Sequence, residues 1–163
     1  MLRSLITRWI FAVCWGRREL NATSVYVDSN VFIAPLLYDN PRSEAAAAVL
    51  RMIETKKVSA YTSTLTWDEV VWVVRRTLGK ADSIEAGKKL LGFPNLRFIP
   101  TSEEVVRGAQ GLVADWDLDP RDAIHIASAL SKRVNILVSD DSDLNVPAGL
   151  RRLSTGSFIE ERG

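Results

Sequence analysis

Short apolar runs alternate with longer stretches of helical periodicity along most of this chain. Residues 24–27 (Ser-Val-Tyr-Val) are mainly β-branched and aromatic and stop at the polar triplet Asp28-Ser29-Asn30, so they predict a buried strand. Short apolar runs at 59–62, 96–99 and 135–139 predict three more strands, and residues 150–154 are expected to add a short strand at the edge. The expected sheet therefore has four to five strands.

The segments between these runs have the composition and end signals of helices. Apolar residues recur at helical spacing, and Gly79, Gly92 and the pair Asp119-Pro120 mark helix ends and a helix start. Strands that are apolar throughout and separated by helices are typical of a parallel sheet covered on both faces, so we expect a three-layer α/β/α sandwich. The predicted helices cover residues 43–55, 66–78, 82–91 and 102–116, and one that starts at 119–120.

The 163 residues fit one folded domain, because 47% are hydrophobic and 25% are charged, which excludes a disordered or fibrous chain. We assign residues 24–157 to the domain, 1–23 to an N-terminal extension that is flexible, weakly helical or the product of a start codon placed too far upstream, and 158–163 to a C-terminal tail. The apolar stretch 9–15 is too short to span a bilayer, so no membrane partner is expected.

Charge and cysteine content narrow the possible partners and compartment. The formal net charge is +1, so a nucleic acid would have to be held by a local basic patch or through metal ions. The single Cys14 cannot form an internal disulfide, and no Cys/His spacing of the zinc type is present. A reducing compartment, the cytoplasm, is expected.

Acidic residues follow predicted strands or begin predicted helices at sites far apart in the sequence. Strand carboxyl ends and helix amino ends share one edge of such a sheet, and if the sheet reverses direction after its first strand, the strand at 135–139 lies beside it. Carboxylates gathered there would repel one another unless a divalent cation neutralised them, and Mg²⁺ or Mn²⁺ suits oxygen ligands. Such a site fits phosphodiester hydrolysis. The acids are Asp28, Glu69, Asp122, Asp140, Asp141 and Asp143.

Each acid also has a simpler interpretation. Glu69 fits a capping box with Thr66, Asp122 follows the predicted cap Asp119 by three residues, and Asp28 and the acidic run at 140–143 could be ordinary turn residues. Their joint placement at one edge favours the metal site. The only histidine, His125, lies in an apolar stretch and is expected to pack in the interior outside the site.

These motifs together resemble the PIN domain family. The resemblance rests on Val27-Asp28-Ser29-Asn30, on Glu69, on residues 122–127 (Asp-Ala-Ile-His-Ile-Ala) and on residues 139–144 (Ser-Asp-Asp-Ser-Asp-Leu). It implies a Mg²⁺- or Mn²⁺-dependent endoribonuclease acting on RNA, often the toxin of a toxin–antitoxin pair with an antitoxin partner, and commonly a homodimer. Leu144 stands where the family often has Phe, and Ser139 stands where Thr is commoner.

The resemblance also implies roles for individual residues. Asp28, Glu69, Asp122 and Asp141 match the catalytic, metal-binding acids, with Asp143 as an auxiliary metal-binding acid, and Asn30 and Ser139 match polar residues that support them. Asp140 matches an adjacent position without a fixed role.

Other functions remain open at this point. An RNA-processing or repair nuclease would carry the same motifs, whereas a catalytically silent PIN module that binds RNA or protein would be expected to have lost one of the acids. A receiver domain or a haloacid-dehalogenase-like phosphatase also has Asp after its first strand, but Asn30 replaces the second Asp of the phosphatase motif and no receiver Lys is evident. The apolar helix with Trp67 and Trp72 is either buried between neighbours or a partner surface.

Overall fold

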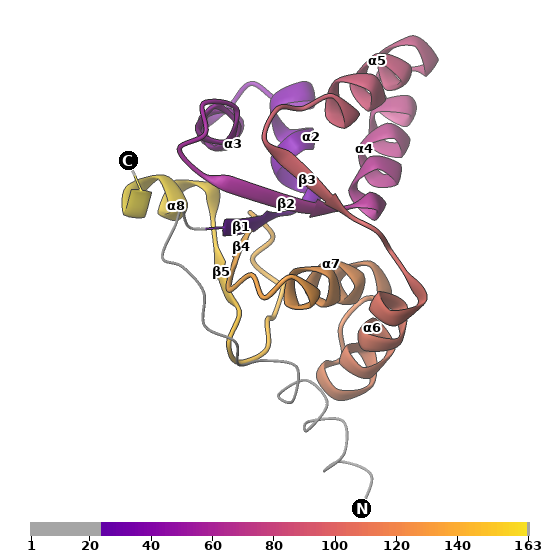
Figure 1. Cartoon of the computed structure of the whole chain (residues 1–163). Coiled ribbons are helices and arrows are strands. Elements are labelled where there is room, and N and C mark those ends of the chain that lie inside the picture. Colours follow the sequence, from indigo (N-terminus) through magenta and orange to yellow (C-terminus); the bar gives the residue numbers. More distant parts are fainter. Residues whose placement is uncertain (1–23, 163) are drawn as a thin grey trace, which may run out of the picture.

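A central parallel sheet organises the protein, whose computed structural model describes residues 24–162. The strand order is β3-β2-β1-β4-β5, and every pairing is parallel (Figure 1). Strand β1 pairs with β2 on one side and with β4 on the other, so the sheet changes direction at β1. This confirms the predicted α/β/α class and the predicted neighbour of the first strand. The strands are β1 (Ser24–Val27), β2 (Ser59–Ser63), β3 (Leu96–Ile99), β4 (Ile136–Val138) and β5 (Arg151–Leu153).

Seven helices cover the sheet within the described residues, and local capping accounts for several of their starts. Asn40 and Ser43 form a reciprocal capping box at the start of a helix whose first residue is Pro41. At another helix start, the Ser102 side chain accepts a hydrogen bond from the Val105 N–H. The helices are α2 (Ser29–Leu37), α3 (Pro41–Glu54), α4 (Thr64–Thr77), α5 (Lys80–Leu91), α6 (Glu103–Trp116), α7 (Pro120–Ser131) and α8 (Thr155–Arg162).

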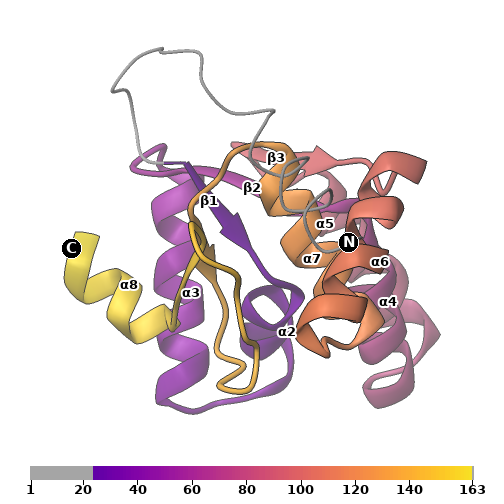
Figure 2. The same ribbon diagram turned by 90° about the horizontal axis from the view of Figure 1, so that it is seen from below.

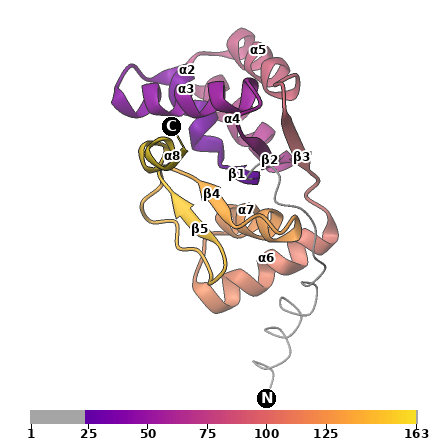
Figure 3. The same ribbon diagram turned by 60° about the vertical axis from the view of Figure 1, so that its left-hand side comes forward.

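The two faces of the sheet pack against different helices. Val25 and Val27 point toward the core that α2, α3, α4, α5 and α8 share, whereas Tyr26 points toward the core formed with α6 and α7. All three side chains are fully buried, as alternation along a doubly covered strand requires. Figure 3 shows the sheet between these two groups of helices.

Helix α2 was not predicted from the sequence. Its residues are apolar almost throughout and include Pro35, so no amphipathic period marks the segment, and Asp28 caps it by accepting the Ser29 N–H. The predicted start of α4 is also corrected. Helix α4 begins at Thr64 behind the cap Ser63, which places Glu69 in the second turn and makes the expected Thr66–Glu69 capping box wrong.

The chain remains folded beyond the expected domain boundary at residue 157. Helix α8 continues to Arg162 and lies beside α3 (Figure 2). Its Phe158 is fully buried in the core with α3. The predicted boundary therefore falls inside a packed helix. The predicted extension 1–23 lies outside the described residues. Between residues 24 and 162, no helix has the length and apolar character needed to cross a bilayer.

Candidate active site

Asp28 lies at the switch point of the sheet, where β1 ends beside β4. Its backbone N–H donates to the Val138 carbonyl at 3.1 Å, which continues the ladder between the two strands. Asp28 is only 8% exposed, and its carboxylate accepts three short hydrogen bonds, from the Ser29 N–H, the Asn30 Nδ2 and the Ser139 hydroxyl, each at 2.7 Å. Three donors from two strand ends thus fix its orientation.

Asn30 and Ser139 contact each other as well as Asp28. Asn30 Nδ2 also donates to Ser139 Oγ at 2.8 Å, and Asn30 Oδ1 accepts the Asp140 N–H at 3.3 Å. The structure therefore brings both predicted supporting residues to the predicted acid, across 109 positions of sequence. Their effect on activity stays a prediction.

His125 lies inside this site, so its expected exclusion from the site is wrong. The ring is 2% exposed, as a packing residue would be, but Nε2 lies 2.7 Å from Glu69 Oε2 and 3.6 Å from Asp28 Oδ1. Asp122 and His125 are three residues apart on α7, a spacing that places both on one helix face. That spacing was the sequence signal that could have identified it.

Glu69 reaches the site from the second turn of α4, and its side chain is mostly buried. Burial by itself would raise the pKa of its carboxyl group, but the hydrogen bond and the positive charge of His125 outweigh this, with smaller contributions from a hydrogen bond with Ser29 and from the charge of Arg121. The pKa of Glu69 is therefore lowered, and the group is a carboxylate at neutral pH.

Asp122 occupies the first turn of α7, as predicted. Partial burial, followed by the charges of Asp28 and Asp141, raises its pKa to about 6. Asp28, Asp122 and Asp141 come from three distant segments, and their charges act on one another in one region of negative potential. A group that takes up a proton this readily would also gain from a bound cation.

The acidic run after β4 divides into three environments. The Asp141 N–H donates to Ser139 Oγ at 3.2 Å, and its carboxylate accepts the Asp143 N–H at 2.9 Å. Asp143 is exposed. Asp140 instead accepts hydrogen bonds from the Thr155 N–H at 2.8 Å and from the Thr155 hydroxyl, so its carboxylate ties the strand end to α8.

The donor set fits a divalent cation. Within residues 24–162, Asp28, Glu69 and His125 form a group whose possible ligand atoms all lie within 4.8 Å of one another. Asp122 and Asp141 add negative charge to the same region. A set made mostly of carboxylate oxygens is what Mg²⁺ and Mn²⁺ prefer as ligands.

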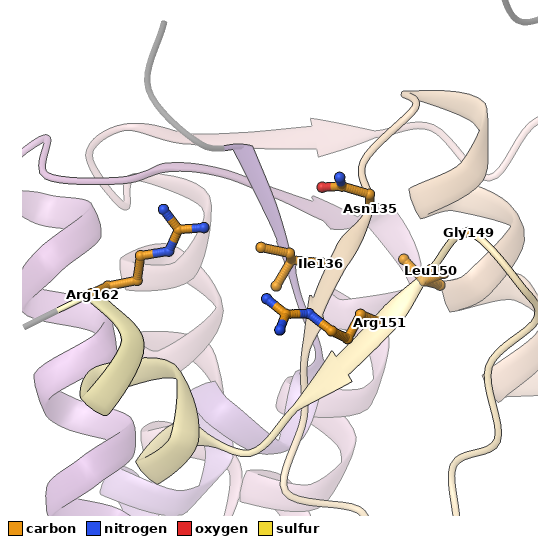
Figure 4. A pocket seen from close by; sticks show the side chains of 6 residues that line it. All are labelled: Asn135, Ile136, Gly149, Leu150, Arg151 and Arg162. Atoms are coloured by element: carbon orange, nitrogen blue, oxygen red, sulfur yellow. The ribbon is translucent and has the colours of Figure 1, made fainter. Parts of the chain in front are cut away.

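A pocket of about 490 Å³ lies at the opposite edge of the sheet (Figure 4). It is lined at the amino ends of β4 and β5 and includes Arg151, which is paired with Glu161 at 2.8 Å. It contains none of the acids described above and is separate from their site. The lining residues are Asn135, Ile136, Gly149, Leu150, Arg151 and Arg162.

Comparison with known families agrees with this geometry. The PIN domain model matches residues 25–150, a span that includes the segments bearing all six acids. The chain belongs to the PIN domain family. A comparison with curated proteins finds no match.

Solved PIN-fold structures support the fold at low sequence identity. FitAcB from Neisseria gonorrhoeae is 18% identical with a TM-score of 0.64, covering 81% of this chain and 98% of its own. VapBC2 from Rickettsia felis, bound to a promoter DNA fragment, is 13% identical with a TM-score of 0.63 and the same coverage. VapC20 from Mycobacterium tuberculosis, a sarcin–ricin loop cleaving toxin, is 18% identical with a TM-score of 0.61, covering 74% of this chain and 92% of its own.

Proposed function

We propose that this PIN protein is a Mg²⁺- or Mn²⁺-dependent endoribonuclease. The observation that carries the proposal is the meeting of Asp28, Glu69, Asp122 and Asp141 at the carboxyl edge of β1 and β4, where burial and the charges of Asp28 and Asp141 raise the pKa of Asp122. Carboxylates that raise one another's pKa in this way cluster at functional sites.

The proposed roles follow from the position of each acid. Asp28, Asp122 and Asp141 would hold the cation, with Asp143 contributing from the exposed side. When bound, a divalent cation activates water and stabilises negative charge that builds on a phosphate. Glu69, a carboxylate at neutral pH, can accept a hydrogen bond from the attacking water, while Asn30 and Ser139 keep Asp28 oriented.

RNA binding needs a local source of positive charge, because the chain has a net charge of only +1. Arg121 is exposed in the first turn of α7, between the N-cap residue Asp119 and the acid Asp122 in the sequence. Its charge lowers the pKa of Glu69. We therefore propose that Arg121 contacts a substrate phosphate beside the acids.

We also propose that the protein is the toxin of a toxin–antitoxin pair, acts in the cytoplasm and forms a homodimer. A toxin–antitoxin complex from Klebsiella pneumoniae shares the fold, as does VapBC2 bound to promoter DNA. Large apolar side chains are exposed on α2, α4 and α5, as on surfaces that bind partners. Trp72 is 49% exposed with Arg76 stacked over it. Trp72→Glu is expected to convert a dimer into monomers in light scattering, and an unchanged mass would contradict this surface.

The proposed activity is tested with purified protein and end-labelled RNA. Cleavage is expected with Mg²⁺ or Mn²⁺, none is expected with EDTA, and Asp28→Asn should lower the rate at least about 100-fold, more than the loss of a supporting group. Asp68→Asn is a matched control, because Asp68 is exposed on α4 next to Glu69. Cleavage that persists in EDTA, or in Asp28→Asn, would contradict the proposal.

A further inference from the structure

A buried chain of hydrogen bonds stands behind the acidic site and is not explained by ligand chemistry. The Ser63 N–H donates to the Tyr26 hydroxyl at 2.9 Å, and that hydroxyl shares a 2.7 Å hydrogen bond with His125 Nδ1. The other ring nitrogen, Nε2, lies 2.7 Å from Glu69 Oε2. The chain therefore connects β1, the start of α4 and the middle of α7 to one carboxylate.

The hydrogen on Nε2 follows from the partners of the ring. A carboxylate oxygen can only accept a hydrogen bond, so the 2.7 Å contact with Glu69 Oε2 is made through a hydrogen on Nε2. On the other side, Nδ1 is held by the Tyr26 hydroxyl, whose oxygen also accepts the Ser63 N–H. The ring thus has a defined orientation before any ion binds.

The same distances argue against His125 as a direct ligand. Adjacent ligands of an octahedral Mg²⁺, each about 2.1 Å from the ion, lie about 3.0 Å apart. Nε2 and Glu69 Oε2 are closer than this, at a separation typical of a charge-assisted hydrogen bond. Asp28 Oδ1, at 3.6 Å from Nε2, is too far for a second hydrogen bond of that kind.

We propose that His125 is a positioning residue, whose Nε2–H holds the Glu69 carboxylate beside Asp28 while Tyr26, anchored by the Ser63 N–H, holds the ring. This inference rests on the proposed function only in treating Glu69 as an acid of the metal site. It assigns a functional reason to two buried polar side chains, Tyr26 and His125, that a purely apolar core would not need.

Nitrogen NMR tests the inference without any variant, because His125 is the only histidine in the chain. In ¹⁵N-labelled protein saturated with diamagnetic Mg²⁺, we expect Nε2 to show the shift and one-bond coupling of a protonated ring nitrogen. A protonated Nε2 supports positioning. An Nε2 without hydrogen in the Mg²⁺-bound protein would mean direct ligation and would overturn the proposal.

Variants test the consequence for the site. His125→Leu fills similar space without a donor and is expected to weaken Mg²⁺ binding roughly 10–100-fold, the usual cost of losing a supporting hydrogen bond. His125→Gln restores an N–H donor and should recover most of this affinity, and Tyr26→Phe should weaken Mg²⁺ binding in the same direction. Equal Mg²⁺ affinity in the folded wild type, His125→Leu and Tyr26→Phe would overturn the proposal. It would also be overturned if His125→Gln bound Mg²⁺ as weakly as His125→Leu.

Ser128→Ala is the matched control for α7. Ser128 is buried three residues after His125, and its hydroxyl is without a hydrogen-bond partner among the described residues, so its loss should leave Mg²⁺ affinity unchanged. Calorimetric Mg²⁺ titration needs no RNA, which separates the two hypotheses. If the variants change Mg²⁺ affinity but the wild type cleaves no RNA, only the proposed function is contradicted. If the wild type cleaves RNA but Nε2 carries no hydrogen in the Mg²⁺-bound protein, only this inference is contradicted.

Discussion

The imidazole of His125 and the carboxylate of Glu69 meet at 2.7 Å, although 56 positions separate them in the sequence. His125 belongs to α7, which covers one face of the sheet, and Glu69 belongs to α4, which covers the other. The pair therefore closes the carboxyl edge of the sheet from both sides, directly over Asp28. Helices from opposite layers can share a site only at such an edge.

The first prediction concerns the pKa of His125. Burial alone would lower it, but the hydrogen bond to Glu69 and the charges of Asp28, Glu69 and Asp122 raise it above its usual value. Replacing Glu69 with Gln removes one of these charges, so the pKa of His125 should fall in NMR titrations without divalent cations. A pKa that stays the same or rises in Glu69→Gln would contradict the described contact.

The raised pKa of His125 also sets how the free energy of unfolding depends on pH. A histidine whose pKa is raised by folding stabilises the protein below its unfolded pKa, and this contribution is lost as the pH rises through the folded pKa. In EDTA, the free energy of unfolding should therefore decline over that range in the wild type. The decline should be smaller in Glu69→Gln.

The second prediction is that Asp122→Asn stabilises the cation-free protein while abolishing cleavage. Folding raises the pKa of Asp122 to about 6, so the folded state holds its proton more tightly, and stability falls as the pH rises from about 4 to about 6. Asn lacks this charge. After discounting for solvent screening of a half-buried group, about 1 kcal/mol, or 2–4 °C in Tm, is expected at neutral pH in EDTA.

Divalent cation provides the control for that prediction. Saturating Mg²⁺ should raise the Tm of the wild type, because the ion binds the folded state and neutralises the clustered carboxylates. The Tm of Asp122→Asn should change little, because this variant lacks one of the carboxylates that hold the ion. An Asp122→Asn variant that is less stable than wild type in EDTA would show that the carboxylate is not under repulsion.

The third prediction separates Asp140 from Asp141. Asp140→Ala removes the hydrogen bonds to Thr155 and should cost about 1–3 kcal/mol of stability without changing Mg²⁺ affinity. Asp141→Ala should have the opposite pattern, with weaker Mg²⁺ binding and a smaller loss of Tm. Chemical unfolding and calorimetric titration of both variants decide this, and reversed roles would contradict the assignment.

Sequence reasoning located the site better than it located the helices that build it. The neighbour of the first strand and the edge that collects Asp28, Asp122 and Asp141 follow from topology, which depends on apolar runs and crossover rules. The start of α4 did not follow, because the cap Ser63 is also the last residue of β2 and no loop separates the two elements.

His125 and α8 were misjudged for a different reason. A histidine among isoleucines has the apolar setting of a packing residue, and its role depends on Tyr26 and Glu69, which only the folded chain brings to it. The segment 158–163 is short and half of its residues are charged, so nothing local signals that Phe158 enters the core. In both cases, long-range packing decides what local composition leaves open.

The fourth prediction follows from that burial. Phe158 is fully buried against α3, so Phe158→Ala should destabilise the protein by about 3–5 kcal/mol, as for other buried aromatic side chains. Ile159, which is only partly buried beside it, is the matched position, and Ile159→Ala should cost less. Equal, small losses for both in urea unfolding would mean that α8 does not belong to the cooperative unit.

Binding of Mn²⁺ to the wild type and to Asp28→Asn is the most direct test of the account, because electron paramagnetic resonance measures the free ion without any RNA. The account predicts that the wild type binds Mn²⁺ and that Asp28→Asn, which keeps the shape of the side chain, loses this binding, while Asp68→Asn retains it. Equal Mn²⁺ binding by all three proteins would contradict the central claim that the acids at this sheet edge form a metal site.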